Sequence, residues 1–228
     1  MIGNIAHQSR QPLTVISVIS STLNMQIQLG IMKNDEAKKD LDKLQDTVKY
    51  LSSIIDKFRN FFNPNNKKEE FILIDVIKDN LEIFESTYKS HNIDLIMNIE
   101  KDIKINGYKF ELMQVVINII NNAKDALIQN VSTKNKRTIY IDAYNEKNSV
   151  NILIYDNAGG IPANIKEKIY EPYFTTKHKS QGTGLGLYMS NEIIQKHFRG
   201  ELSNKIISFN HNEEEVKGEE FKIVVPIS

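Results

Sequence analysis

The sequence predicts an α+β protein in which a two-helix hairpin precedes an α/β sandwich, with helices on one face of a mixed sheet. Two observations predict this fold. Residues 35–62 repeat apolar side chains at spacings of three and four, as in a helix that packs along a seam. From about residue 69 onward, short strand patterns alternate with amphipathic helix patterns. The chain has 228 residues, 40% of them hydrophobic, which suffices for a core in each part.

The seam of residues 35–62 predicts a helix that needs partner helices. Upstream, a similar stripe of isoleucines predicts a first helix, which Pro12 should bend, and residues 30–34 form the turn between the two. Because two helices cannot enclose a core, we expect a homodimeric four-helix bundle. The alternative is that the hairpin packs against the rest of its own chain. The seam consists of Leu41, Leu44, Val48, Leu51, Ile55, Phe58 and Phe62.

Turn formers and lysines at residues 63–68 predict a linker between a first domain at 1–62 and a second at 69–228. The second domain contains a long stretch without regular pattern, residues 157–183, and so long a loop in a compact domain is usually functional. The expected strands are 71–74, 93–99, 137–144, 149–156, 201–207 and 220–227, the last two separated by an acidic turn at 210–215, and the expected helices are 75–90, 109–129 and 184–197.

Charge and cysteine content exclude several classes of protein. Lys plus Arg number 29 and Asp plus Glu number 29, so no basic excess indicates nucleic acid as a partner. Without cysteine there is neither a disulfide framework nor a cysteine-ligated zinc site. No apolar stretch approaches the roughly 20 residues that span a bilayer, and the first residues lack a signal-peptide pattern. We expect a cytoplasmic location, either for a free protein or for the cytoplasmic part of a membrane-anchored one whose sensor region precedes Met1.

An acidic, glycine-containing turn, Asp156-Asn157-Ala158-Gly159-Gly160, follows directly on the strand at 149–156. Its glycines allow the backbone to approach a flat ligand closely. An ionised carboxylate only accepts hydrogen bonds, so Asp156 is suited to the exocyclic amino group of adenine. Taken alone, the segment is equally an ordinary turn that contains an acid.

Two further patterns are suited to a nucleotide's phosphates. The segment Gly182-Thr183-Gly184-Leu185-Gly186-Leu187 leads into a helix, where free N–H groups and the helix dipole attract phosphate. On the helix at 109–129, Asn118 and Asn122 lie four residues apart and share a face. Their amide oxygens are suitable ligands for a magnesium ion. The alternative is that these asparagines only form a solvated helix face.

In this order, four motifs resemble the N, G1, F and G2 boxes of histidine kinase ATPase domains: residues 118–123, 156–160, 170–177 and 182–187. The resemblance covers residues 69–228 and implies the ATP-binding fold shared with type II topoisomerase and heat-shock chaperone ATPases. It implies ATP and Mg²⁺ as cofactors, and residues 157–183 as the ATP lid. It also implies that Asn122 is the main metal ligand, Asn118 a second polar contact, Asp156 the reader of adenine, Phe174 the lid anchor, Lys177 a phosphate contact, and Gly160, Gly182, Thr183, Gly184, Leu185 and Gly186 parts of the nucleotide site.

The first helix carries a fifth motif, residues 7–13, which resembles the H box of the same kinases. The resemblance implies that His7 accepts the phosphoryl group and that Arg10 steadies the phosphate or the adjoining domain. His7 lies off the apolar stripe, so we expect its ring to face solvent, where a neutral imidazole can attack the γ-phosphate. Gln8 stands where many relatives carry an acid, and glutamine cannot take the proton of the ring. The catalytic set is therefore His7, Gln8 and Arg10. The other four histidines show no metal-ligand spacing and are interpreted as incidental.

The predicted function is that of an ATP-dependent protein-histidine kinase, which phosphorylates its own His7 and passes the phosphoryl group to an aspartate of a response regulator. Gln8, together with Glu219 in place of a threonine-containing pattern, motivates a second hypothesis, a nucleotide-binding scaffold with weak or lost transfer. A third is a topoisomerase- or chaperone-type ATPase. The His7 motif argues against it, as does Asn118, which stands where those ATPases have a catalytic glutamate.

Overall fold

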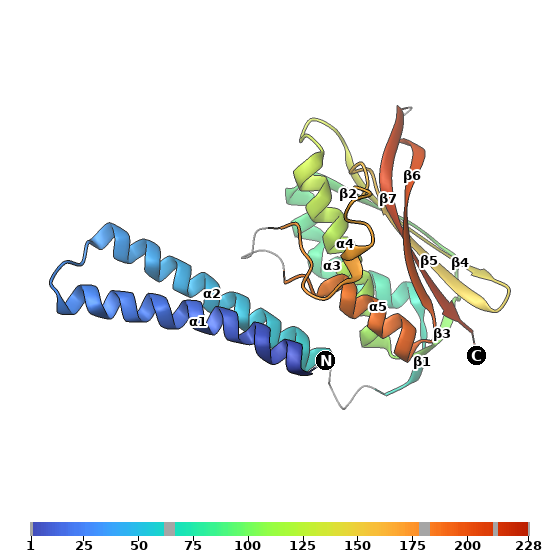
Figure 1. The fold of residues 1–228 in the computed structure, drawn as a ribbon. Helices are drawn as coiled ribbons and strands as arrows, with labels where there is room; N and C mark the ends of the chain where they lie inside the picture. Colours follow the sequence, from blue (N-terminus) through green and yellow to red (C-terminus); the bar gives the residue numbers. More distant parts are fainter. Residues whose placement is uncertain (1, 62–66, 178–182, 212–213, 228) are drawn as a thin grey trace. The chain divides into compact units, whose positions relative to one another are not determined.

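The computed structural model describes residues 2–61, 67–177, 183–211 and 214–227 (Figure 1). The chain divides into two compact units, residues 1–64 with 175–183 and residues 65–174 with 184–228. The first unit contains a helical hairpin, and the second contains both sheets. In the described part of the chain, no helix has the length and apolar character needed to cross a membrane.

The hairpin consists of α1 (Ile2–Gln28) and α2 (Asn34–Phe61), as the sequence predicted. In the turn, Gly30 has φ +64°, a left-handed conformation that favours glycine. Two acids, Asp35 and Glu36, lie in the first turn of α2, where they complement the helix dipole. The helix α1 is continuous through Pro12. Several large apolar side chains of the hairpin are exposed, among them Leu13, Val18, Met25, Leu41 and Val48.

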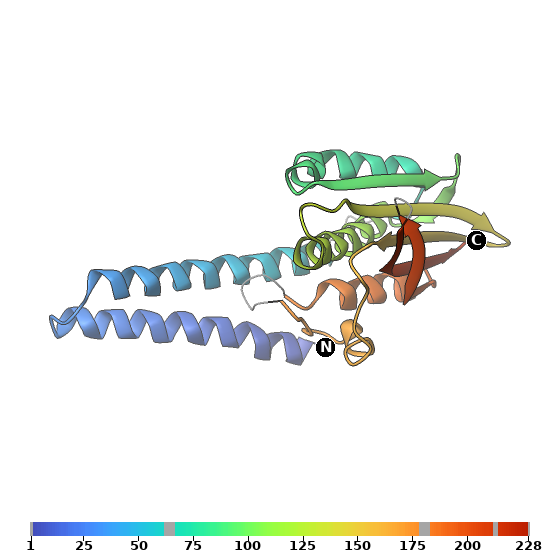
Figure 2. The ribbon, with the colours of Figure 1, turned by 90° about the horizontal axis from the view of Figure 1, so that it is seen from above.

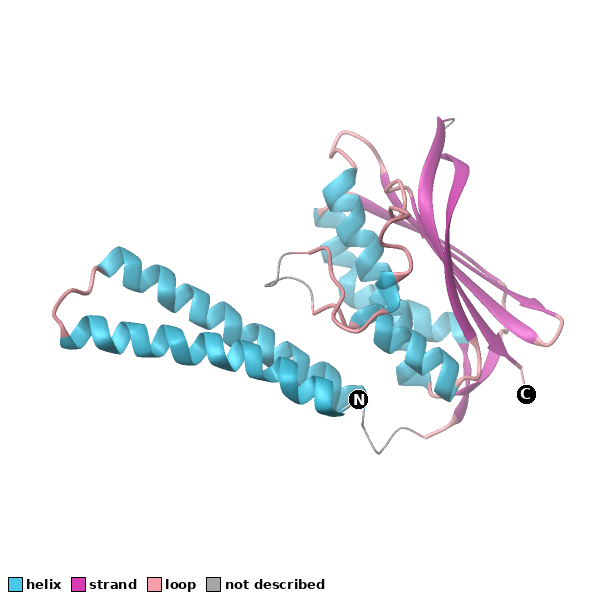
Figure 3. Cartoon of the chain, viewed as in Figure 1, coloured by secondary structure: helices cyan, strands magenta, loops and turns pink. Residues whose placement is uncertain are grey.

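A five-stranded mixed sheet in the order β2-β4-β5-β7-β6 forms one layer of the second unit. Strand β2 pairs with β4 in parallel, and every other neighbouring pair is antiparallel. Figures 2 and 3 show the helices α3, α4 and α5 on one face of this sheet. The elements are β2 (Ile93–Ile99), β4 (Arg137–Glu146), β5 (Ser149–Asp156), β6 (Glu201–His211), β7 (Glu214–Pro226), α3 (Leu73–Ser90), α4 (Lys109–Asn130) and α5 (Gly186–His197). The predicted layer architecture is confirmed.

The core lies between the sheet and the three helices. Alternate residues of the central strands face the helices, and these positions hold β-branched side chains that suit a packed sheet surface. The helices contribute the apolar face of α4 and one side of α5. Side chains that are at most 1% exposed include Ile139, Ile141, Ile152, Ile154 and Ile223 from the sheet and Leu112, Val115, Ile119 and Ile193 from the helices.

The start of the second domain differs from the prediction, because it contains a separate two-stranded sheet. It pairs β1 (Glu69–Ile72) with β3 (Lys104–Gly107), which the sequence analysis did not predict. The helix α3 begins at Leu73, so the expected strand at 71–74 was wrong at its end. Leu73 is fully buried in the first turn of the helix, and a short apolar run cannot distinguish a strand from a buried helix start.

The last two strands are longer than predicted. Asn210 pairs with Glu215 and His211 with Glu214, so the acidic turn expected at 210–215 was too long at both ends, and its centre lies outside the described residues. The strands β6 and β7 lie at one edge of the sheet, and the helices cover only one of its faces (Figure 2). Residues 214–219 contain one apolar side chain, Val216, so this part of β7 lacks the apolar/polar alternation by which strands are recognised.

Candidate functional site

Asp156, the last residue of β5, lies at the centre of the predicted adenine site. It is 4% exposed, and its Oδ1 accepts a hydrogen bond of 2.8 Å from the backbone N–H of Ala158. Burial raises the pKa of this carboxyl to about 6, the backbone N–H groups of Ala158 and Glu219 oppose the rise, and the charge of Glu219 adds to it. The Asp156 carboxyl is therefore ionised at neutral pH and protonated in mild acid.

The turn after Asp156 is fixed to the neighbouring strand and needs glycine at its end. Asn157 Oδ1 accepts a hydrogen bond of 2.9 Å from the backbone N–H of Thr138. Gly160 has φ +89°, and a Cβ there would lie 2.9 Å from Ile206 Cγ1. A larger residue at position 160 would therefore strain the backbone and force the side chain of Ile206 to move.

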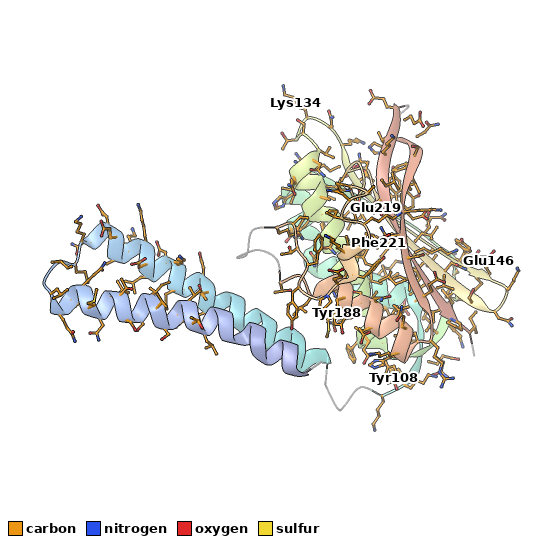
Figure 4. The ribbon with its side chains drawn as sticks, viewed as in Figure 1. Tyr108, Lys134, Glu146, Tyr188, Glu219 and Phe221 are labelled. Atoms are coloured by element: carbon orange, nitrogen blue, oxygen red, sulfur yellow. The ribbon has the colours of Figure 1, made fainter. Side chains whose placement is uncertain are left out.

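A buried polar network that the sequence analysis missed lies beside Asp156. Glu219 of β7 is 3% exposed, and its Oε2 accepts a hydrogen bond of 2.8 Å from the backbone N–H of Ile161. Its Oε1 accepts a hydrogen bond of 2.5 Å from Asn204 Nδ2, and Asn204 Oδ1 accepts one of 3.0 Å from the Tyr170 hydroxyl. Figure 4 shows Glu219 and Phe221 on β7 within the second unit. Only the strand register could have revealed this network, because its members are scattered along the chain.

The structure joins two of the predicted motifs at Asn118. Its Nδ2 donates hydrogen bonds to the backbone oxygen of Gly186 at 3.4 Å and to Ser190 Oγ at 3.3 Å. Gly186 begins α5, so the asparagine face of α4 lies against the start of the helix that follows the glycine-rich segment. Asn122 lies one helical turn further along α4 and is half-buried.

The end of the predicted lid is closed by a backbone hydrogen bond. The N–H of Tyr173 donates to the carbonyl oxygen of Gly184 at 2.7 Å. Gly184 has φ +63°, and a Cβ there would lie 2.3 Å from the carbonyl carbon of Tyr173. Glycine at 184 is therefore required for close approach of the backbone. Phe174 is half-buried, whereas Leu185 is buried.

Several predicted site residues give less structural detail. The backbone N–H of Lys177 donates a hydrogen bond of 3.1 Å to Thr175 Oγ1, and Thr183 is buried. Gly182 lies outside the described residues. His7, Gln8 and Arg10 all lie in the first half of α1, but their side chains are outside the described part of the structure, so the expected exposure of His7 stays a prediction.

Three of the histidines interpreted as incidental have structural partners, and one of them is His91, whose Nδ1 lies 2.9 Å from the carbonyl oxygen of Thr87. His197 Nδ1 lies 2.5 Å from Oε2 of the buried Glu111, and His211 Nδ1 lies 2.8 Å from the Tyr140 hydroxyl. Within the described ranges, no group of three or more His, Cys, Asp or Glu side chains could hold a metal ion. A metal ion at this site would therefore depend on amide and phosphate oxygens.

Residues 107–228 match the family of histidine kinase-, DNA gyrase B- and HSP90-like ATPases, and residues 1–66 match the His Kinase A (phospho-acceptor) domain. The chain thus belongs to this ATPase family, and the sandwich fold and the buried Asp156 agree with that membership. The two matches, in this order along one chain, identify it as the catalytic core of a bacterial two-component sensor histidine kinase.

Characterised kinases are similar to the chain over most of its length. Sporulation kinase A of Bacillus subtilis is 30% identical over 229 residues, which cover 99% of this chain and 34% of that protein. The signal transduction histidine-protein kinase AtoS of Escherichia coli is 27% identical over 201 residues, which cover 86% of this chain and 31% of that protein. The chain therefore spans about a third of the length of these two relatives.

Solved structures confirm the fold of the second unit and of the whole chain. The catalytic domain of histidine kinase ThkA superposes with a TM-score of 0.55 at 28% identity, over 70% of this chain and 95% of that one. The structure of ThkA in complex with the response regulator protein TrrA gives a TM-score of 0.67 at 22% identity, over 100% of this chain and 61% of that one. At that identity the second likeness concerns the fold alone.

Proposed function

We propose that the chain is an ATP-dependent protein-histidine kinase core, which transfers the γ-phosphoryl group of ATP to His7 and then to an aspartate of a response regulator. One observation supports the proposal above the others. A phospho-acceptor hairpin that contains His7 is followed, in the same chain, by an ATPase-family domain with a buried carboxyl at the end of β5. The proposed domains are residues 1–62 and 69–228, joined by a linker at 63–68.

The nucleotide binds with its adenine at Asp156. The carboxylate accepts the exocyclic amino group, and the turn that ends at Gly160 allows the base to lie against the backbone. A carboxylate that accepts a hydrogen bond from a bound base in a site shielded from water discriminates strongly against bases without that donor. The proposed adenine site therefore favours ATP over nucleotides that lack an amino group at this position.

The phosphates bind between the asparagine face of α4 and the glycine-rich segment before α5. The hydrogen bond between Asn118 and the Gly186 carbonyl supports this arrangement, because it brings the two motifs together. The amide oxygen of Asn122 would hold Mg²⁺, which prefers oxygen ligands and would neutralise charge on the phosphates. The backbone N–H groups of residues 182–186 and the side chain of Lys177 bind phosphate oxygens, and Phe174 anchors the lid.

In the transfer step, a ring nitrogen of His7 attacks the γ-phosphorus, the bond to the bridging oxygen breaks, and ADP leaves. The attack leaves the ring as a cation, and the N–H on its other nitrogen must lose its proton to give neutral phosphohistidine. Gln8 can only hydrogen-bond the ring, so solvent takes this proton. Arg10 contributes positive charge to the phosphoryl group, and the metal ion and N–H donors carry most of the charge stabilisation.

A second copy of the chain completes the helical bundle in this proposal. Leu41 and Val48 belong to the predicted seam and are 54% and 45% exposed in the single chain. Large apolar side chains in a row on an exposed face indicate an interface. The homodimer buries them in a four-helix bundle on which the response regulator docks, and we place the core in the cytoplasm.

Incubation with γ-labelled ATP and Mg²⁺ tests the proposed activity. Wild type should acquire label that is acid-labile and stable in base, as expected of phosphohistidine, and His7→Ala should acquire none. Gln8→Glu supplies a proton acceptor and should label faster than wild type. Label that survives the His7→Ala change overturns the proposal.

A nucleotide-binding scaffold is the second candidate, favoured by Gln8 beside the acceptor. In that case calorimetry detects ATP binding to the full chain, but no label appears on His7 at any time. Fast labelling of wild type excludes this candidate.

A further inference from the structure

We propose that Glu219 is a positioning residue for nucleotide binding, which holds the start of the lid against the sheet beside Asp156. This inference rests on the proposed binding of adenine at Asp156 and deepens it. Glu219 stands where the resemblance to kinase ATPase domains expects a threonine, so its role does not follow from that resemblance.

The register of the sheet places Glu219 on the helix-facing side of β7. Its neighbours at alternate positions, Phe221 and Ile223, are both buried and face the helices. The same face of β5 ends at Asp156, whose carboxyl also interacts with the backbone N–H of Glu219. The side chain of Glu219 therefore lies inside the sandwich, next to the proposed adenine site.

The Glu219 carboxyl connects two separate points of the lid to the sheet. One oxygen binds the backbone N–H of Ile161, the residue that follows the glycine turn. The other binds Asn204, which in turn accepts a hydrogen bond from Tyr170 at the end of the short helix η1 (Lys168–Tyr170). A single side chain thus restrains residues 161–170, the part of the lid that begins at the base-binding turn.

Only a carboxylate meets both requirements at this position. A threonine has one oxygen on a shorter side chain, so it cannot accept from Ile161 and Asn204 together. A glutamine has the same size, but its amide presents an NH₂ group to one of the two donors. Glu219→Gln therefore breaks one of the two bonds without creating a cavity, and a buried donor left unsatisfied is costly.

Glu219 also acts on Asp156 through its charge. The two carboxyls are close enough for the Glu219 charge to raise the pKa of Asp156, in addition to the larger effect of burial. Among the described residues, Glu219 is the charged group whose electrostatic interaction shifts the pKa of Asp156. Neutralising Glu219 should therefore lower the pKa of Asp156, and a purely structural role would not produce this effect.

The test compares full-length Glu219→Gln with wild type. Calorimetric titration with ADP and Mg²⁺ between pH 5 and pH 8.5 should show about tenfold weaker binding at pH 8. The acid pH at which affinity is half lost should move to a lower value. Hydrogen exchange of peptides that cover residues 157–170 should become faster in the absence of nucleotide.

The matched control is Glu220→Gln, a change at the adjacent residue. Glu220 is also buried but faces the opposite side of the sheet, where it pairs with Lys205 at 3.1 Å. The Glu220→Gln change should leave unchanged the affinity for ADP, the pH dependence of that affinity and the hydrogen exchange of residues 157–170. Tyr170→Phe removes the hydroxyl that binds Asn204 and should accelerate exchange near residue 170 while leaving the pH profile as in wild type.

Two outcomes separate this inference from the proposed function. If Asp156→Asn abolishes ADP binding but Glu219→Gln binds with wild-type affinity and exchange, the inference is wrong and the adenine site stands. If Asp156→Asn binds ADP as wild type does, the adenine site itself is wrong. Equal losses in Glu219→Gln and Glu220→Gln also overturn the inference, because they indicate a general effect on the strand.

Discussion

Glu111 Oε2 and His197 Nδ1 lie 2.5 Å apart and join the first turn of α4 to the last turn of α5. The glutamate is buried, and the imidazole ring lies 5.5 Å from the ring of Tyr108, centroid to centroid. This pair holds the ends of the two helices that carry the proposed phosphate-binding motifs.

Removing the imidazole should destabilise the second unit. His197→Ala takes away a hydrogen bond to a buried carboxyl, which lowers the free energy of unfolding by about 1–3 kcal/mol. Urea unfolding at pH 7 measures the change. Lys196→Ala is the control, since its ion pair with Glu192 lies on the surface and its loss should leave the free energy of unfolding almost unchanged. Equal effects of the two changes would contradict a structural role for the pair.

Nucleotide affinity should fall as the pH is lowered through about 6. Burial raises the pKa of Asp156 to about 6, and a protonated carboxyl no longer offers the free acceptor that the amino group of adenine needs. Below that pH the affinity should decline by up to tenfold for each unit of pH. Titrations with ADP at several pH values test this, and an affinity constant from pH 5 to 8 would falsify the assignment of Asp156 to the base.

Asp156→Asn should weaken nucleotide binding but stabilise the nucleotide-free protein at pH 8. The pKa of this group in the folded protein lies above its value of 3.8 in the unfolded chain, so the folded state binds the proton more tightly. The stability that this group contributes is fully present below pH 3.8 and is lost as the pH rises to about 6. The loss amounts to up to about 3 kcal/mol in the free energy of unfolding. Asparagine carries no charge and avoids this loss.

The check is urea unfolding of both proteins at pH 8 and at pH 4, without nucleotide. The stabilisation by asparagine should be present at pH 8 and absent at pH 4, where the wild-type carboxyl is protonated when folded. A variant that is less stable than wild type at pH 8 would show that the hydrogen bonds of the carboxylate outweigh its burial.

Gly184→Ala should abolish nucleotide binding, whereas Gly30→Ala should not. Both glycines have a positive φ, so alanine costs about 1 kcal/mol of backbone strain at either position. At position 184 the new Cβ would also overlap the backbone of Tyr173, while at position 30 no atom lies within 4 Å. Thermal unfolding and ADP titration of the two variants separate backbone strain from steric overlap. Similar losses of stability and of ADP affinity in both variants would argue against the close approach of Gly184 to Tyr173.

Leu41→Lys should convert the proposed homodimer into monomers. A charge in the centre of a helical seam cannot be buried without a large penalty. Gln45→Lys is the control, because this residue is exposed and polar on the same helix. Sedimentation at micromolar concentrations should show monomers for Leu41→Lys and dimers for wild type and the control. A monomeric wild type would remove the basis for the four-helix bundle.

Long regular patterns made most of the fold predictable. The apolar repeat of α2 and the buried isoleucines of β4 and β5 follow directly from side-chain periodicity, and both were located within one or two residues. The strand β3 was missed because, of its four residues, the sequence pattern offers only Ile105 as an apolar signal. The extended ends of β6 and β7 were missed because residues 208–211 and 214–219 are mostly polar or charged and contain only Phe209 and Val216 as large apolar side chains.

The site was predictable where its chemistry is local in the sequence. Asp156 and the glycines after it form one short segment, so a base-binding turn could be proposed from the sequence, although the resemblance was needed to prefer it to an ordinary turn. The contact between Asn118 and Gly186 was not predicted: the resemblance assigned each residue to the nucleotide site, and the structure supplies the hydrogen bond between them. The role of Glu219 could not be predicted, because it depends on which residues of β6 and the lid the register brings to its two oxygens.

The backbone hydrogen bond between Tyr173 and Gly184 makes the segment between them tolerant of changes in length. It closes a loop at its base, so Tyr173 stays beside the segment that leads into α5 when the length of the chain between Tyr173 and Gly184 changes. Loop-closure entropy grows slowly, by about 0.6 kcal/mol for each doubling of length. Insertions in this loop should therefore cost little free energy of unfolding, which allows the nucleotide contacts proposed for Phe174 and Lys177 to be varied separately from the stability of the fold.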